Sequence, residues 1–289
     1  MPTVFFRNQV LKTGKNQQQA PFAGANAQGG TAEGSVISYA KGFCMPFTKL
    51  GGSLMFTLGY IVLNIIVLIV ATILVVIGAM IYNDTAVGGI LFGIVTGIPL
   101  LLVAMGWNAD ALTRMTSALN SGTPLPGFIG ALVSPNFKAS LKISGAWVLL
   151  LVAFAIAMAI VFGLGFWILS QFVHPFMLIR PFYILASIVY IVFFCFFVPF
   201  TVFSAAESLA DGVPASAACH NAAGMVLHNI VKVVLAYIVA VLIALITALI
   251  VAKIGEIAYI GKILAFIINI FLMIAQFSGW IAVRNSLKK

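Results

Sequence analysis

The chain has 289 residues, of which 63% are hydrophobic and only 7% are charged. Soluble domains carry about 25% charged residues, so this composition excludes a water-soluble surface of ordinary make-up. The formal net charge is +9. The basic residues are spread over loops and tails and form no stripe with interleaved aromatic residues, so we expect no nucleic-acid partner.

Residues 1–40 are predicted to be a disordered cytoplasmic tail. The segment contains Arg7, Lys12 and Lys15, followed by a stretch rich in Gln, Gly and Ala. It has too little apolar surface to offset the entropy lost on ordering. No apolar core of signal-peptide length precedes the first long apolar run.

Six segments between residues 41 and 285 are long and apolar enough to form transmembrane helices, which need about 20 mostly apolar residues. They run from Met55 to Tyr82, Val87 to Trp107, Gly145 to Phe172, Met177 to Phe203, Ile230 to Ala252 and Tyr259 to Val283. The predicted fold is an all-α polytopic membrane protein of three hairpins with interfacial cytoplasmic helices. Residues 286–289 are predicted to form a C-terminal tail.

The basic residues predict the orientation. Of the 15 Lys and Arg residues, only Arg180, Lys253 and Lys262 lie on the side of the short turns. The other side holds both termini and two long loops, at about 108–144 and 204–229. Because basic residues concentrate on the cytoplasmic side, we expect the long loops and both termini there, in a bacterial inner membrane.

Each long loop contains the pattern Leu-x-x-Gly-x-Pro. Gly122 and Pro124 belong to the first loop, and Gly212 and Pro214 to the second. Glycine accepts the positive φ that ends a helix, and proline suits the first turn of the next one. We therefore expect a sharp elbow in each loop, followed by a new helix that leads into the next span.

The two elbows belong to a short internal repeat. A shift of 90 residues places the first pattern on the second without a gap, and it also places Lys142 on Lys232. Both copies precede an odd-numbered span. Repeated hairpins build many membrane transporters.

Three glycines of the second span, Gly89, Gly93 and Gly97, recur at four-residue spacing. They share one helix face, and small residues let helices approach closely in lipid. The face predicts tight helix packing, within the chain or with a partner.

No charged residue lies at the middle of any predicted span, which argues against a transporter driven by protons or sodium ions. The acidic residues Glu207 and Asp211, and the pair of Asp110 with Arg114, are interpreted as solvated surface groups. We expect no catalytic, cofactor or metal site. Candidate contacts for a partner protein or for lipid headgroups are Arg114, Lys142, Glu207, Asp211 and Lys232.

The three hairpins and the elbows at 119–124 and 209–214 resemble uncharacterised prokaryotic six-helix membrane proteins. These include the membrane domain that accompanies some glycerophosphodiester phosphodiesterases. The resemblance covers roughly residues 45–285. It implies a fold but no activity, because this chain has no phosphodiesterase catalytic domain.

Three hypotheses follow for the function. The first is a non-enzymatic scaffold or subunit of a membrane complex, with membrane-protein partners or further copies of the chain beside the lipid bilayer. The alternative is a translocator of lipid or another apolar solute, which needs no charge in the membrane. The third is an intramembrane enzyme, for which Glu207 and Asp211 are the only candidate residues.

Overall fold

A computed structural model of the chain describes residues 32–84 and 86–288. Every element in these residues is a helix, in agreement with the predicted all-α fold. In chain order the elements are α1 (Ala32–Thr48), α2 (Leu50–Asp84), α3 (Ala86–Ser121), α4 (Phe128–Leu132), α5 (Phe137–Ser170), α6 (Pro175–Ala205), the π-helix η1 (Ala206–Ala210), α7 (Ala215–His228), α8 (Ile230–Gly255) and α9 (Ala258–Leu287).

Six of these helices, α2, α3, α5, α6, α8 and α9, are long and apolar enough to cross a membrane. Each corresponds to one predicted span, so the six-span prediction is confirmed. The helices continue past the apolar segments on the side of the long loops. The clearest case is α3, which runs on from Trp107 to Ser121. The length of an apolar segment shows how much of a helix suits lipid, but it does not show where the helix ends.

Part of each predicted tail belongs to the folded protein. Residues 32–40 form the first half of α1, so their assignment to a disordered tail is wrong; residues 1–31 lie outside the described part. Ser35, Tyr39 and Gly42 are buried at helical spacing, which explains why this segment is ordered. At the other end α9 continues to Leu287, and Lys288 makes ion pairs, so residues 286–288 also belong to the folded part.

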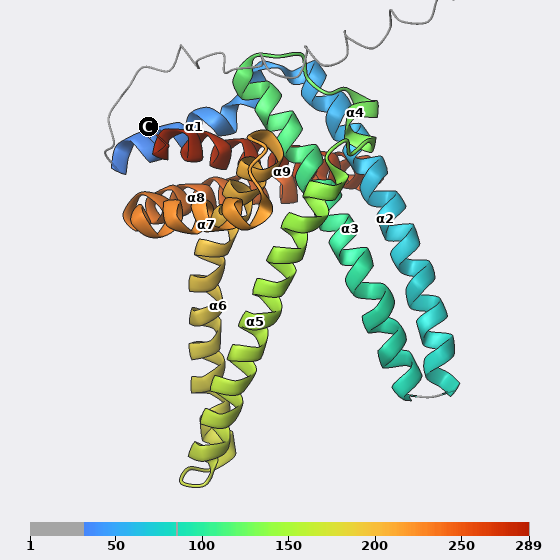
Figure 1. Cartoon of the computed structure of the whole chain (residues 1–289), viewed down its shortest axis with the longest axis vertical. Helices are drawn as coiled ribbons and strands as arrows, with labels where there is room; N and C mark the ends of the chain where they lie inside the picture. Colours follow the sequence, from blue (N-terminus) through green and yellow to red (C-terminus); the bar gives the residue numbers. More distant parts are fainter. Residues whose placement is uncertain (1–31, 85, 289) are drawn as a thin grey trace, which may run out of the picture.

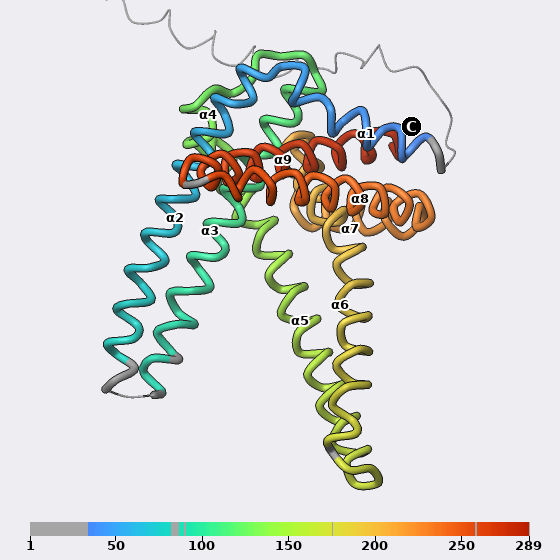
Figure 2. Tube along the Cα trace, turned by 180° about the vertical axis from the view of Figure 1, so that it is seen from behind, coloured from blue at the N-terminus to red at the C-terminus, as the bar shows by residue number. Residues whose placement is uncertain are grey.

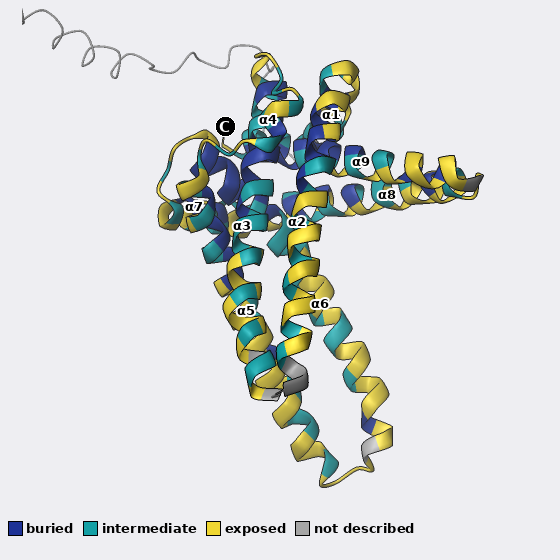
Figure 3. Ribbon diagram, turned by 90° about the vertical axis from the view of Figure 1, so that its right-hand side faces the viewer, coloured by how far each residue is buried: buried dark blue, intermediate teal, exposed yellow. Residues whose placement is uncertain are grey.

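The long helices form three hairpins, α2–α3, α5–α6 and α8–α9, that diverge from one region (Figures 1 and 2). The α2–α3 and α5–α6 hairpins extend in the same general direction and separate along their length. The α8–α9 hairpin runs across them (Figure 3). The three hairpins therefore do not form one compact six-helix bundle.

The core lies where the hairpins meet. We call this region the hub; it comprises α1, α4, η1 and α7 together with the adjoining ends of the six long helices. One cluster of buried side chains joins α1, α6, α7, α8 and α9, a second joins α2, α3, α4 and α9, and a third joins α3, α5, α6 and α7. Phe277 of α9 packs against all three clusters. The hub is thus one continuous core centred on α9.

Outside the hub the hairpins bury little of their apolar surface. The most apolar stretch of each long helix is between 0% buried, in α3, and 28% buried, in α9. Figure 3 shows the contrast between the buried hub and the exposed hairpins. In a membrane the acyl chains of lipids, or other membrane helices, solvate these surfaces as well as a protein core would.

Close backbone contact joins α1 to α9. A Cβ atom added at Gly42 would lie 2.6 Å from Cβ of Ala282 and 2.6 Å from the carbonyl oxygen of Ser278. Beside this contact the ring of Tyr39 meets the indole of Trp280 edge to face, with centroids 5.4 Å apart. The absence of a side chain at Gly42 lets α1 lie directly on α9 and complete the hub.

We predict that Gly42→Ala lowers the free energy of unfolding by about 1–3 kcal/mol, because the added methyl group forces the two backbones apart. Thermal unfolding in detergent, followed by circular dichroism, measures the effect. The matched control is Gly145→Ala in α5, where an added Cβ meets no described atom within 4 Å. The control should leave the free energy of unfolding unchanged or raise it by up to about 1 kcal/mol. Equal effects of the two substitutions would contradict the packing described for α1.

Candidate functional site

The two elbows have the same backbone conformation. Gly122 and Gly212 both have a φ of 72°, the left-handed conformation that was expected to end the preceding helix. Pro214 lies directly before α7, as its N-cap residue. Pro124 lies in the non-helical segment that leads to α4 and not in the first turn of a helix, which differs from the expectation. One cluster of charged residues includes Asp211, directly before Gly212 of the second elbow, and another connects α3 with the segment that follows the first elbow.

The cluster at the first elbow is organised by Asp110 and Arg114 of α3. Asp110 is completely buried, and its carboxylate accepts hydrogen bonds from Nε of Arg114 at 3.2 Å and from the side-chain amide of Asn136 at 3.2 Å. Arg114 also donates to the carbonyl oxygen of Gly130 at 2.8 Å and to that of Val133. The cluster therefore joins α3 to the whole connection between α3 and α5.

The carbonyl contacts of Arg114 explain why the short helix α4 is stable. The last carbonyl groups of a helix have no partner within the helix, and a cation near them is favourable. Arg114 fills this role at the C-terminal end of α4, while Asp110 holds the guanidinium group in place.

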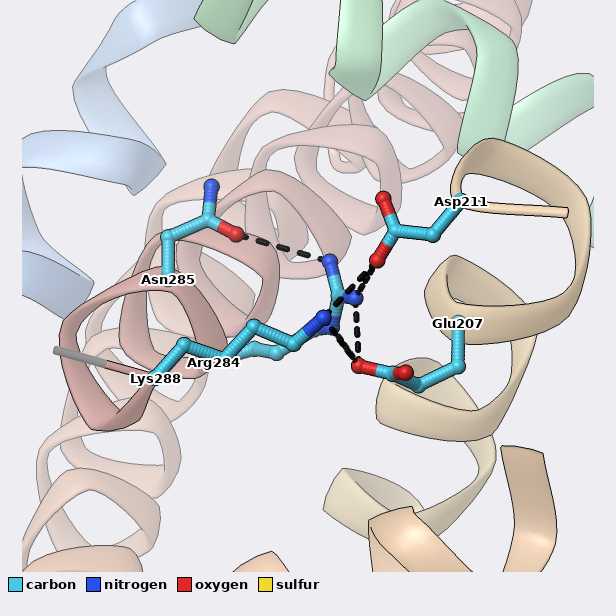
Figure 4. A network of polar contacts seen from close by, with 5 residues as sticks. All are labelled: Glu207, Asp211, Arg284, Asn285 and Lys288. Carbon is cyan, nitrogen blue, oxygen red and sulfur yellow. Dashed lines mark hydrogen bonds and ion pairs between the residues drawn. The ribbon is translucent and has the colours of Figure 1, made fainter. Parts of the chain in front are cut away.

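The cluster at the second elbow joins the end of the second hairpin to the end of the third (Figure 4). Arg284 of α9 donates to Glu207 of η1 at 2.5 Å and to Asp211. Lys288 pairs with the same two carboxylates, at 2.5 Å and 2.8 Å. Glu207 and Arg284 are only 2% and 4% exposed. Their charges are therefore balanced inside the protein, which a buried ion pair requires.

The π-helical turn η1 sets the position of both carboxylates. The amide of Asp211 donates to the carbonyl oxygen of Ala206, five residues earlier, at 3.2 Å. The amide of Val213 donates to the carbonyl oxygen of Glu207 at 3.0 Å. These two bonds close the helix end, so that Glu207 and Asp211 both point toward Arg284 (Figure 4). Single π-helical turns are frequent at functional sites.

The positive charges beside Asp211 lower the pKa of its carboxyl group. Burial acts to raise the pKa of the Asp211 carboxyl, but the hydrogen bond and charge of Lys288 and the charge and hydrogen bond of Arg284 lower it by more. The net pKa lies below the ordinary value of 3.8. Asp211 therefore stays ionised when the protein is moderately acidified.

The interpretation of these acidic residues as solvated surface groups is wrong for Asp110 and Glu207, which are buried. Asp211 is exposed, as expected. The prediction also omitted Arg284 and Lys288. Arg284 and Lys288 are four residues apart, as are Glu207 and Asp211, so each pair lies on one face of a helix. An acidic pair and a basic pair with the same spacing are the pattern in the sequence that could have predicted this contact.

A hollow of about 430 Å³ lies beside the second cluster. It is lined by Glu207, Lys288 and four residues of α7, namely His220, Asn221, Gly224 and Met225. The hollow is open to the outside, and its lining combines both signs of charge with a neutral amide and a thioether. In the described residues no group of three or more His, Cys, Asp and Glu side chains is placed to hold a metal ion.

The other predicted contact residues lie apart from the two clusters. Lys142 is exposed near the start of α5. Lys232 is half-buried near the start of α8, and its carbonyl oxygen accepts a hydrogen bond from Ser35 of α1 at 3.1 Å. In α3, Gly93 and Gly97 are exposed, with no described atom within 4 Å of an added Cβ; Gly89 is half-buried. Packing of this face against another helix stays a prediction.

Comparisons of the chain with protein-family models, with curated proteins and with solved structures give no match. The resemblance to six-helix prokaryotic membrane proteins stays a prediction. The fold nevertheless defines the class of the protein. The chain is a polytopic α-helical integral membrane protein with six helices suited to cross a lipid bilayer.

We predict that Arg284→Met lowers the free energy of unfolding by about 3–5 kcal/mol, because Glu207 stays buried beside one partner fewer. The double variant Arg284→Met/Glu207→Leu should recover most of this loss, since apolar residues tolerate burial. Chemical unfolding in detergent measures both. The control Lys253→Gln removes an exposed ion pair with Glu256 and should cost at most about 1 kcal/mol. A double variant less stable than Arg284→Met would contradict the account.

The low pKa of Asp211 makes the stability of the fold depend on pH. Because its pKa is lower in the folded chain, Asp211 stabilises the fold above its ordinary pKa of 3.8, and this contribution is lost as the pH falls through the folded-state value. At neutral pH the chain should unfold at a higher temperature than its Asp211→Asn variant. The difference should shrink as the pH falls below 3.8. A difference that stays constant down to about pH 2 would exclude this linkage.

Proposed function

We propose that the chain is a non-enzymatic scaffold or subunit of a membrane complex. In this proposal the hub holds three hairpins in fixed directions, and the hairpins offer apolar faces to the helices of partner proteins or of further copies. The observation that carries the proposal is the contrast in burial, with a continuous core at the hub and between 0% and 28% burial in the most apolar stretches of the long helices.

The distribution of charge supports an orientation with the hub in the cytoplasm of a bacterium whose inner membrane holds the hairpins. Among the described residues, the basic side chains at the hub are Lys41, Lys49, Arg114, Lys138, Lys142, Lys232, Arg284 and Lys288. Arg180 lies toward the far end of the α5–α6 hairpin, and Lys253 and Lys262 lie at the far end of the α8–α9 hairpin, which runs across the other two (Figure 3). Basic residues concentrate on the cytoplasmic side of membrane proteins.

The state of the two acidic candidates supports a non-enzymatic role. Glu207 and Asp211 both pair with Arg284 and Lys288, so their carboxylates hold two helix ends together. A general base needs a pKa near the operating pH, whereas that of Asp211 is lowered. Translocation of lipid has less support, because the hollow lies at the hub beside α7 and not between the apolar parts of the hairpins.

The glycine face of α3 offers a test of partner binding. We predict that Gly93→Leu weakens association with the partner helix and leaves the unfolding temperature of the chain unchanged, because a Cβ added at Gly93 meets no described atom within 4 Å. Mild-detergent purification from membranes of cells that express the chain, followed by mass measurement of the intact complex, gives the stoichiometry. Val95→Leu, at an exposed position on another face of α3, is the matched control.

The complex should contain a second protein or a second copy in fixed proportion, and Gly93→Leu should reduce that proportion. A lone, monodisperse monomer recovered from native membranes would overturn the proposed function.

A further inference from the structure

The hollow beside α7 has features that the scaffold role does not use. Its floor is formed by Glu207, whose side chain is nearly buried yet reaches the hollow, and by Lys288, whose side chain is 40% exposed. Its wall is one face of α7, where His220, Asn221 and Gly224 follow one another at helical spacing. An added Cβ at Gly224 meets no described atom within 4 Å, so this position opens directly onto free space.

The charges at the hollow balance one another. Arg284 and Lys288 carry two positive charges, and Glu207 and Asp211 carry two negative charges. A ligand with a net charge would leave a charge without an opposite partner beside Glu207 and Arg284, which are buried, and this is costly. A ligand that carries one charge of each sign keeps the balance. The hollow therefore favours a zwitterionic group.

Lys288 is the part of the cluster that can exchange its partners. Glu207 keeps Arg284 at 2.5 Å even when Lys288 leaves, because the guanidinium group is buried against it. Lys288 follows the last residue of α9 and has a long, partly exposed side chain. An incoming primary ammonium group can take its place at Glu207 and Asp211, while Lys288 turns to an incoming phosphate.

We propose that this hollow binds a phosphoethanolamine group, with its ammonium on Glu207 and Asp211 and its phosphate on Lys288, His220 and Asn221. The N–H bonds of a primary ammonium replace the hydrogen bonds that Lys288 gives to the two carboxylates at 2.5 Å and 2.8 Å. A phosphate is a strong acceptor for the Lys288 ammonium, the imidazole and the Asn221 amide. As a phosphodiester this group carries one charge of each sign, both in the headgroup of a phospholipid and in the water-soluble compound glycerophosphoethanolamine. A phosphate monoester would carry about −1.5 to −2 at neutral pH.

The proposal distinguishes this ligand from close analogues. Glycerophosphocholine has the same charges, but its quaternary ammonium has no N–H bond to give to Glu207, which would lose a hydrogen bond without replacement. Inorganic phosphate lacks the ammonium and would bring uncompensated negative charge to the two carboxylates. Both analogues should bind more weakly than glycerophosphoethanolamine, by about tenfold or more.

Isothermal titration calorimetry of the full chain in detergent tests the site with glycerophosphoethanolamine, whose phosphodiester carries one negative charge beside the ammonium. Gly224→Leu should weaken binding by about tenfold or more, because the side chain fills the hollow. Gly145→Leu, also at an open glycine within a long helix, should change it by less than about twofold. Lys288→Gln should weaken binding by about tenfold as well, whereas Lys253→Gln should not. Thermal unfolding of each variant verifies that it is folded.

Two results would overturn the proposal: glycerophosphocholine or inorganic phosphate that binds as tightly as glycerophosphoethanolamine, or binding that survives both Gly224→Leu and Lys288→Gln. Absence of binding by both the free compound and the lipid would also overturn it.

A second arm identifies the source of the group. The full chain is placed in nanodiscs of phosphatidylcholine with and without phosphatidylethanolamine, and the free compound is titrated again. If the lipid is the natural source, phosphatidylethanolamine in the disc should weaken the apparent affinity for the free compound, and Gly224→Leu should remove this competition. If the free compound binds equally in both discs, the site takes a soluble phosphodiester of ethanolamine.

Discussion

The arrangement of this protein depends on one buried contact, the pairing of Arg284 with Glu207. Arg284 comes from the end of the third hairpin and Glu207 from the end of the second, and both are nearly inaccessible to solvent. Neither charge is tolerated in the core without the other. The pairing therefore fixes where α9 crosses α6, and α9 in turn carries Phe277, on which all three buried clusters converge.

The apolar hairpins obey a different constraint. In water, exposed helices of this hydropathy would aggregate, but in a bilayer their backbone hydrogen bonds are satisfied within each helix and their side chains suit lipid. They need no mutual packing beyond each hairpin, and they bury little of their most apolar stretches. The chain thus has two kinds of surface. The hub is close-packed and contains buried polar groups, whereas the hairpins leave apolar faces that suit lipid.

The sequence predicted most of the fold because apolar length is a local property of each span. It also predicted the positive φ at Gly122 and Gly212, where no other residue type fits as well. It missed the first half of α1, whose buried stripe of Ser35, Tyr39 and Gly42 holds one large side chain and packs on α9, far along the chain. It named Glu207 but placed it on the surface, because local spacing gives no information about its burial against Arg284.

The most direct test of this account is the separation of the hairpin tips in a membrane. Spin labels at residues 171 and 256 report on the ends of the α5–α6 and α8–α9 hairpins, and pulsed electron paramagnetic resonance measures their distance in nanodiscs. If the hub holds the hairpins apart, the distances will lie far beyond the roughly 8–10 Å between axes of packed helices. A narrow distribution near that packing distance would show a compact six-helix bundle and contradict the account.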